Sequence, residues 1–300
     1  ELATGSIAAG GTLGILIPPS VTMIIYGIST GTSIGRLFIA GILPGLMLTL
    51  LFIGWSMYYS LRSGTFAKGL QRHFSLKEKI EQIPRVLPFL LIIAGILYAL
   101  YGGVATPSEA AGVGAMLCFV LVAVIYGIRK PKQIWDILST STRESVMIMM
   151  IIGAAELLSY TLSSLFITQS IAEWITTIGV NRWLLLAIIN VFLLVAGFFL
   201  PPVAVILMTA PILLPIILQA GFDPYWFAVV LTINMEIGLI TPPVGLNLYV
   251  INGIVPDVGL PQILRGTVPF VLLMLLSILL LCVFPEIATW LPERLMGVSG

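Results

Sequence analysis

The chain has 300 residues, of which 59% are hydrophobic and only 9% are charged, and its mean hydropathy is +1.11. A soluble protein of this length cannot bury so much apolar surface, so a soluble enzyme or a nucleic-acid-binding protein is excluded. The formal net charge of +1 does not indicate a charged partner.

Uncharged segments recur along the whole chain. They are 37–61, 86–108, 110–128, 183–222, 237–256 and 266–285. Most are long enough to cross about 30 Å of hydrocarbon as helices, and the period-2 alternation of a membrane β-barrel is absent. The sequence therefore predicts an all-α polytopic membrane protein in a lipid bilayer. Cys118 and Cys282 each lie in an apolar run, so we expect core residues rather than a disulfide or metal pair.

Residues 1–61 contain the sequence Gly-Ile-Leu-Ile-Pro-Pro-Ser at 14–20 and then an apolar span. The first residue is Glu1, and no signal-peptide pattern follows it. We expect a parent protein that is longer at its N-terminus by roughly a hundred residues or more, because only thirteen residues precede Gly14.

Ten of the fourteen basic residues lie in two short stretches, which the positive-inside rule places in the cytoplasm. They are Arg62, Lys68, Arg72, Lys77, Lys79 and Arg85 in the first stretch, and Arg129, Lys130, Lys132 and Arg143 in the second. We therefore expect a cytoplasmic basic linker at 62–85. Residues 86–144 are expected to form a scaffold, with a hairpin of two spans and an interfacial helix around Trp135.

The region 145–284 is expected to be the second repeat, followed by a tail at 285–300. Its uncharged segment 183–218 is interrupted at Leu200-Pro201-Pro202, where paired prolines remove two backbone donors. This segment is either two spans or one re-entrant hairpin. The other expected spans are 145–167, which runs outward, 225–252, which runs inward, and 266–284, which runs outward.

A self-similarity relates the two ends of the chain. Residues 14–21, Gly-Ile-Leu-Ile-Pro-Pro-Ser-Val, resemble residues 238–245, Gly-Leu-Ile-Thr-Pro-Pro-Val-Gly, at an offset of 224. Residues 41–44, Gly-Ile-Leu-Pro, resemble residues 266–269, Gly-Thr-Val-Pro, at an offset of 225. The loop charges indicate that the first copy runs outward and the second inward, so the repeats are inverted.

Each copy carries a Gly-x-x-x-Pro-Pro sequence that is expected to break a membrane helix. The break frees backbone groups, which must line protein or a water-filled cavity because lipid cannot satisfy them. A matched inverted pair of breaks points to the midplane binding site of a transporter. The alternative is a pair of proline kinks that only shape helix packing.

The candidate binding residues surround the two breaks and the hairpin tip. They are Thr12, Gly14, Pro18, Pro19, Ser20, Pro201, Pro202, Asn234, Gly238, Thr241, Pro242, Pro243 and Asn247. Neutral hydroxyl, amide and carbonyl oxygens suit a monovalent cation such as Na⁺, whereas Ca²⁺ prefers several carboxylates. Glu236, the acid nearest the second break, has two interpretations: a partner for a neighbouring helix, or a group that couples ions.

Enzymatic activity is not expected. Residues 31–35 fit the G-x-S-x-G nucleophile pattern, but the only histidine, His73, lies in a basic loop and no strand context is predicted. No phosphate-binding loop is found in the sequence, and no organic cofactor is expected.

Four charged residues have two interpretations each. Glu109 and Glu156 could serve gating or proton movement, although capping of the helix after Pro107 explains Glu109 equally well. Arg36 and Arg265 are expected to be interfacial anchors rather than ligands of a carboxylate.

Three motifs resemble the large membrane subunit of TRAP transporters, the DctM-like permeases. They lie at 11–20 (Gly-Thr-Leu-Gly-Ile-Leu-Ile-Pro-Pro-Ser), 106–111 (Thr-Pro-Ser-Glu-Ala-Ala) and 237–247 (Ile-Gly-Leu-Ile-Thr-Pro-Pro-Val-Gly-Leu-Asn), and the similarity covers essentially the whole chain. The resemblance implies an elevator-type secondary transporter of the bacterial or archaeal inner membrane, driven by Na⁺. Such a transporter takes organic acids, for example C4-dicarboxylates or sialic acid, from a periplasmic binding protein and works with a small membrane subunit.

The resemblance also implies two hairpins whose tips meet the two broken helices, with a Na⁺ at each junction. The expected Na⁺ ligands are backbone or hydroxyl oxygens of Gly14 and Ser20 at the first break, and of Gly238 and Thr241 at the second. The second tip matches 200–202, and the first is absent from this chain. Many family members have Asp before the proline of the second tip, where this chain has Pro201, so we expect neutral ligands there.

Two other functions remain open from the sequence. One is a stand-alone Na⁺/organic-anion symporter that needs no binding protein. The other is a structural or assembly subunit whose broken helices only make room for a partner.

Overall fold

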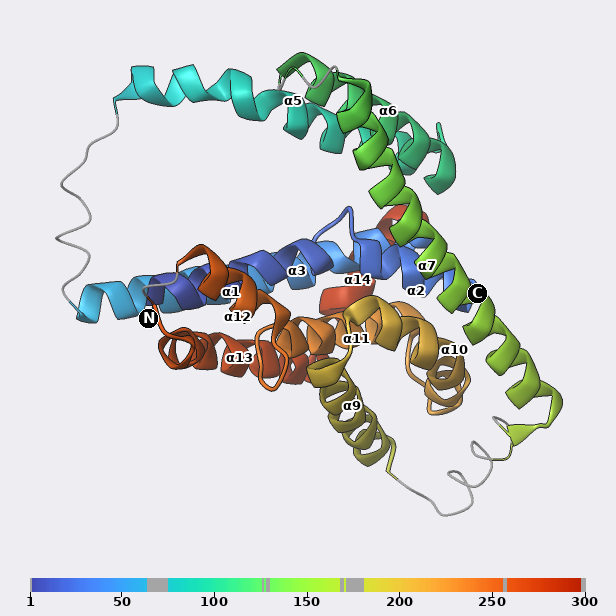
Figure 1. The fold of residues 1–300 in the computed structure, drawn as a ribbon. Coiled ribbons are helices and arrows are strands. Elements are labelled where there is room, and N and C mark those ends of the chain that lie inside the picture. The colour runs from blue at the N-terminus through green and yellow to red at the C-terminus, as the bar shows by residue number, and fades with distance from the viewer. Residues whose placement is uncertain are drawn as a thin grey trace. The chain divides into compact units, whose positions relative to one another are not determined.

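Every regular element that the computed structural model describes is an α-helix (Figure 1). The structure describes residues 2–63, 75–125, 127, 130–167, 170, 181–255 and 258–297. Within these ranges, six helical segments are long and apolar enough to span a membrane. The prediction of an all-α polytopic membrane protein is therefore confirmed. Lys68, Arg72, His73 and Arg129 lie outside the described residues.

The chain divides into two compact units. Unit one contains Glu1–Tyr59 and Met150–Gly300, and unit two contains Ser60–Met149. Two long helices, α3 (Ile34–Arg62) and α7 (Pro131–Ser164), cross the boundaries between them. Unit one therefore holds both Pro-Pro breaks and the 200–202 interruption, whereas unit two holds the segment expected to form the scaffold hairpin.

Unit two is built around an antiparallel helix pair, α5 (Leu76–Tyr101) and α6 (Pro107–Ile125) (Figure 1). The pair packs closely, because a Cβ on Gly114 would lie 2.7 Å from the Ile96 side chain. The first turn of α6 has a capping box, in which Thr106 N and Oγ1 both donate to Glu109 Oε2 at 2.8 Å. This geometry assigns Glu109 the capping role that the sequence left open.

The helices of unit two differ from the expected segments at their ends. α5 begins at Leu76, inside the stretch expected to be a linker. α7 is one helix of 34 residues that continues from the expected interfacial segment into the expected span.

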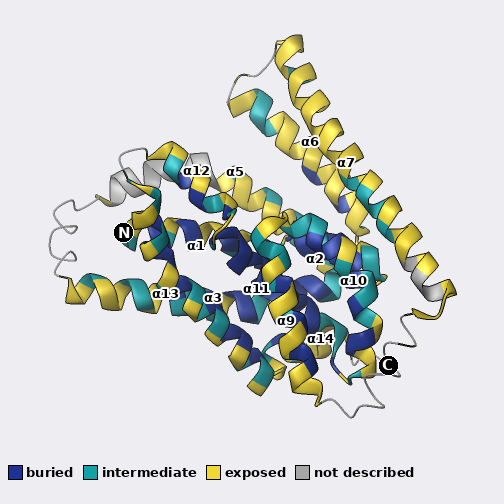
Figure 2. Ribbon diagram, turned by 60° about the horizontal axis from the view of Figure 1, so that its bottom comes forward, coloured by how far each residue is buried: buried dark blue, intermediate teal, exposed yellow. Residues whose placement is uncertain are grey.

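At the centre of unit one lie two interrupted helices. The first consists of α1 (Leu2–Leu16) and α2 (Val21–Thr30), and the second of α11 (Pro224–Leu239) and α12 (Leu246–Ile254). Every residue of α11 from Trp226 to Leu239 is buried, as the dark blue of this helix in Figure 2 shows. α11 begins sharply because the Asp223 carboxylate accepts from Tyr225 N and Trp226 N at 2.8 Å, and because Pro224 needs no N–H partner.

The other helices of unit one surround this centre. α9 (Arg182–Phe199) and α10 (Pro202–Gln219) form a helical hairpin, with α9 packed on α11 and α10 on both α2 and α11. α13 (Leu260–Val283) packs along α1, where the backbones of Gly5 and Gly266 touch so closely that a side chain on Gly5 would collide with the Gly266 carbonyl. α14 (Glu286–Met296) packs on α11 and α13.

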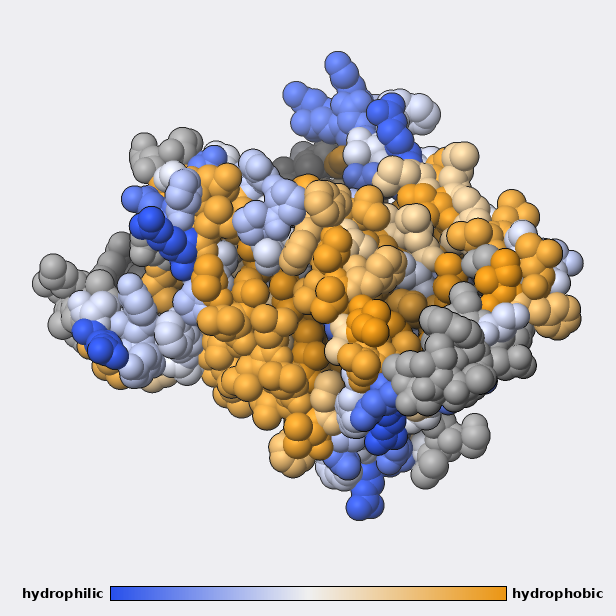
Figure 3. All heavy atoms as spheres, turned by 90° about the horizontal axis from the view of Figure 1, so that it is seen from below, coloured by the Kyte–Doolittle hydropathy of each residue, from blue (hydrophilic) through white to orange (hydrophobic). Residues whose placement is uncertain are grey.

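Large hydrophobic side chains cover the outer faces of the peripheral helices. On α9 and α13 they include Leu184, Ile188, Val191, Leu272 and Leu279, each more than half exposed. Figure 3 shows a broad, continuous hydrophobic area on the face that it presents. Such a surface is stable only against lipid or an apolar partner, as expected for membrane-spanning helices.

Candidate functional site

The first break follows from the two prolines after α1. Pro18 and Pro19 have no N–H, so the carbonyls of Gly14 and Ile15 lose their helical donors. Hydroxyl groups replace the donor to Ile15: Ser20 Oγ donates to the Ile15 carbonyl, and Thr22 Oγ1 donates to it at 2.9 Å. Ser20 Oγ also accepts from Met23 N at 3.3 Å and caps α2. The predicted residue Ser20 therefore lies at the break and holds its two ends together.

The second break has the same cause. Pro242 and Pro243 remove the helical donors to the carbonyls of Gly238 and Leu239, and α11 ends at Leu239. The Gly238 carbonyl accepts from Thr241 N instead, at 3.5 Å. The Ile237 carbonyl accepts from Thr241 Oγ1 at 2.6 Å, so this predicted hydroxyl lies at the end of α11. Gly245, with φ of +50°, turns the chain into α12.

The tip of the α9–α10 hairpin meets this second break. Pro202 removes the helical donor to the Phe198 carbonyl, and Val244 N donates to this carbonyl instead, at 3.3 Å. Gly238 touches the backbone of Gly197 so closely that a Cβ would lie 2.7 Å from its carbonyl carbon. The structure therefore brings together the predicted residues of the hairpin tip and of the second break.

A small pocket of about 140 Å³ occupies this junction. Its lining combines the hairpin tip with both ends of the second break and consists of Gly197, Phe199, Leu200, Pro201, Gly238, Leu239, Val244, Gly245 and Leu246. None of these residues has a polar side chain, so the polar groups that the pocket offers are backbone groups. Carbonyl oxygens without helical donors are ligands of the kind that a small cation takes.

The two interrupted helices run antiparallel. Tyr26 Oη, near the end of the first, donates to the Pro224 carbonyl at the start of the second, at 3.1 Å. Asn247 Nδ2, near the end of the second, donates to the Ala8 carbonyl near the start of the first, at 3.4 Å. The two copies of the repeat therefore lie side by side in opposite directions.

The spans that follow the two breaks pack in corresponding ways. A Cβ on Gly41 of α3 would lie 2.7 Å from the Leu16 carbonyl. Thr267 Oγ1 of α13 lies 3.5 Å from the carbonyl of Ile240, the residue that corresponds to Leu16 in the repeat. In both copies, the span that follows the break thus approaches the carbonyl at a corresponding position of the break, at Leu16 and at Ile240.

Two predicted residues take part in helix contacts away from the breaks. Thr12 is buried and donates to the Ala9 carbonyl within α1, at 2.8 Å. Asn234 donates to Asn190 Oδ1 of α9 at 2.5 Å and to the Val230 carbonyl at 2.9 Å. The Asn234–Asn190 contact joins α11 to α9, whereas the Thr12 bond lies within α1, and neither residue donates a hydrogen bond at a break.

Sequence reasoning missed Gly197, Phe198 and Asn190. A signal for the first two was present, because they lie four residues before Pro201 and Pro202 and so lose their helical donors. Asn190 had no comparable signal, because its partner is 44 residues away.

Buried oxygen atoms without partners gather in α11. Among the residues that the structure describes, both carboxylate oxygens of Glu236 and the side-chain oxygen of Asn234 are buried and accept no hydrogen bond. All three atoms are acceptors. Buried acceptors without donors fit a cation better than they fit an anion or a neutral ligand.

Arg36 is engaged at the end of another helix. Its guanidinium donates to the carbonyls of Met296 and Gly297 at 3.2 and 2.6 Å, and it lies 5.4 Å from the centre of the Tyr225 ring. It thus satisfies carbonyls at the C-terminal end of α14, where a positive charge is favourable.

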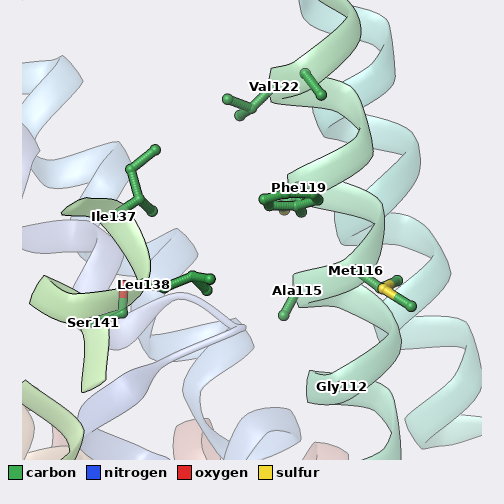
Figure 4. Close-up of a pocket in the computed structure, with 10 residues that line it drawn as sticks. Gly112, Ala115, Met116, Phe119, Val122, Ile137, Leu138 and Ser141 are labelled. Atoms are coloured by element: carbon green, nitrogen blue, oxygen red, sulfur yellow. The ribbon is translucent and has the colours of Figure 1, made fainter. Parts of the chain in front are cut away.

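A larger pocket lies in unit two, between α6 and α7, and has a volume of about 620 Å³. Leu138 of α7 points toward Ala115 and Phe119 of α6 across this space (Figure 4). Ser141 is the one hydroxyl in a lining that is otherwise apolar. With so few polar groups, this pocket is not suited to a charged substrate.

Comparison with known proteins gives consistent matches over nearly the whole chain. The family described as tripartite ATP-independent periplasmic transporter, DctM component, matches residues 1–287. The C4-dicarboxylate TRAP transporter large permease protein DctM of Pseudomonas aeruginosa is 38% identical over 98% of this chain and 68% of its own length.

Two relatives with other named substrates match over similar ranges. The sialic acid TRAP transporter large permease protein SiaM of Vibrio cholerae is 31% identical over 99% of this chain and 69% of its own length. The 2,3-diketo-L-gulonate TRAP transporter large permease protein YiaN of Escherichia coli is 31% identical over 94% of this chain and 65% of its own length.

Proposed function

Because the chain belongs to the DctM component family of tripartite ATP-independent periplasmic (TRAP) transporters, we propose that it forms the ion- and substrate-binding core of a Na⁺-coupled importer of organic acids. The chain is a multi-pass membrane protein and a transporter subunit rather than an enzyme. Beyond family membership, we propose four properties of the transporter: its coupling ion, its substrate class, its partner proteins and its movement.

One observation carries the proposal: two helix breaks lie antiparallel in one compact unit, and a hairpin tip docks on the second of them through Val244 N and the Phe198 carbonyl. Freed carbonyls inside a membrane protein need a ligand, a protein donor or water. The first break offers the Gly14 carbonyl beside Ser20. The second offers the Leu239 carbonyl beside Thr241, and next to it the Gly238 carbonyl, which accepts only from backbone N–H groups of the break itself. These neutral oxygens fit Na⁺. Movement of the bound Na⁺ down its gradient would supply the free energy for substrate uptake.

The substrate class rests on the relatives. Their named substrates, C4-dicarboxylate, sialic acid and 2,3-diketo-L-gulonate, are all organic acids. A carboxylate substrate would be favoured close to the bound cations. We propose an organic carboxylate delivered by a periplasmic binding protein, with a small membrane subunit as partner and the inner membrane as location.

The proposed movement is an elevator. Unit one, with both breaks and a re-entrant α9–α10 hairpin, would be the transport domain, and α5 and α6 of unit two would belong to the scaffold. Unit one holds the candidate ligands. Backbone contacts also join its hairpin to the second break, and a domain that moves as one rigid body requires such contacts.

Uptake by proteoliposomes tests the function. The complete transporter, with its small subunit, should accumulate a radiolabelled C4-dicarboxylate or sialic acid when an inward Na⁺ gradient and the cognate binding protein are both present. A K⁺ gradient should support only background uptake. Uptake without the binding protein would instead indicate a stand-alone symporter, and absence of Na⁺-dependent uptake of any organic acid would contradict the proposal.

A further inference from the structure

Glu236 is a buried acid without a counter-charge. Its side chain is fully buried in the last turn of α11, and neither carboxylate oxygen accepts a hydrogen bond from the described residues. An ionised carboxylate in such a place is unstable unless a cation or several donors neutralise it. The helices around Glu236 show whether a cationic side chain is available to neutralise it.

Glu236 lies on the face of α11 opposite to α9. Asn234 and Gly238 mark the α9 face, because they contact Asn190 and Gly197. Successive helical residues are about 100° apart, so Glu236 projects away from these two positions. The other helices that pack on α11 are α1, α2, α10, α12, α13 and α14.

Those helices provide no cationic side chain for Glu236. The described residues of α1, α2, α10 and α12 include no charged side chain. The charged residues of α13 and α14 are Arg265, Glu286, Glu293 and Arg294, and all four are exposed, whereas Glu236 is buried. The neutralising charge must therefore come from a ligand.

Glu236 is level with the first break. The contact of Pro224 with Tyr26 and that of Asn247 with Ala8 fix the alignment of the two interrupted helices. Glu236 lies midway between Pro224 and Asn247 in sequence, and the midpoint between Ala8 and Tyr26 is residue 17. The acid is thus at the height where α1 ends and where Pro18 leaves the Gly14 carbonyl without its helical donor.

The chemistry of the free atoms favours a metal cation over a proton. A protonated carboxyl would gain an O–H donor, and this donor and the second oxygen would both stay buried without partners. A monovalent cation satisfies both carboxylate oxygens. The pair of carboxylate and monovalent cation is neutral, which suits a membrane interior.

We propose that Glu236 is the acidic ligand of a monovalent-cation site at the level of the first break. The proposal rests on the Na⁺ coupling proposed above and adds a charged ligand to the neutral groups of the first break. Glu236 would then be the residue that sets the charge of this site.

Cation binding can be measured without transport. The complete transporter with its small subunit is placed in lipid nanodiscs, and its melting temperature and its ²²Na⁺ binding are followed as NaCl replaces choline chloride. E236Q should raise the Na⁺ half-saturation about 10–150-fold, as expected when a charged ligand becomes neutral. E236D should raise it less, because the charge remains but the carboxylate is drawn back by one methylene. Glu144→Gln, which removes an exposed acid of α7, is the matched control and should behave as wild type.

The outcomes are distinct. Absence of a Na⁺ effect in the wild type would contradict the proposed Na⁺ coupling itself. A normal Na⁺ effect in E236Q, or an equal loss in Glu144→Gln, would overturn only the role of Glu236. If E236Q does not fold, E236D decides the question, because an unchanged half-saturation in that variant would also overturn the proposal.

Discussion

Prolines shape the candidate site through the carbonyls that they leave without donors. Each Pro-Pro pair of unit one frees two carbonyls four residues earlier, so the positions of the breaks could be predicted from the sequence alone. The replacement donors could not be predicted. Val244 N reaches the Phe198 carbonyl across 46 residues of sequence, and this pairing depends on tertiary packing.

Replacing Thr241 by Val tests the second break at the residue scale. The change removes a hydroxyl but keeps the shape of the side chain, and loss of one ligand of a small cation should cost about 1–3 kcal/mol, or about 5–150-fold in the half-saturation of uptake for Na⁺. Thr209→Val is a matched control, because Thr209 Oγ1 makes the same type of bond, to the Val205 carbonyl within α10, at 2.7 Å. A half-saturation that is equal in Thr241→Val and wild type would remove Thr241 from the site.

At the scale of elements, the repeat predicted more of the fold than the hydropathy did. The two copies of one motif predicted the paired breaks, and the loop charges predicted their opposite directions. The Tyr26 and Asn247 contacts show the antiparallel arrangement directly. The ends of the helices were predicted less accurately from the sequence. Charges around 77–85 suggested a linker, yet α5 begins at Leu76, because a charged segment can continue a helix beyond the apolar core of a membrane.

The contact between α9 and α11 gives a prediction about these two elements. Gly238→Ala would place a Cβ 2.7 Å from the Gly197 carbonyl carbon, where rigid backbone cannot yield, so the variant should lose about 1–3 kcal/mol of stability. Gly10→Ala is the control, because α1 has open space at this position and alanine favours the helix. Thermal unfolding in detergent compares them, and a Gly238→Ala variant as stable as Gly10→Ala would contradict the close packing of hairpin and break.

At the scale of the whole molecule, the division into two units agrees with the proposed division of labour. Both breaks and the hairpin are in unit one, and the α5–α6 pair is in unit two. From the sequence, the basic stretches and the position of the repeats predicted a scaffold at 86–144, between segments at 1–61 and 145–284 that carry the repeats. They could not indicate that α3 and α7 cross the boundary as continuous helices, because no proline or glycine signal marks a helix that passes between units.

The proposed elevator is tested most directly by the accessibility of two single cysteines, introduced after Cys118 and Cys282 have been replaced. Val203 lies just after the hairpin tip in unit one, and Val104 is 71% exposed in the α5–α6 turn. Val104 is preferred to Thr106 because Thr106 caps α6.

The measurement is the rate of labelling by a membrane-impermeant thiol reagent, with and without Na⁺, in the complete transporter. If unit one carries the site across the membrane, Na⁺ will change the rate at V203C and leave the rate at V104C unchanged. Equal responses to Na⁺ at the two positions would contradict a transport domain that moves against a fixed scaffold.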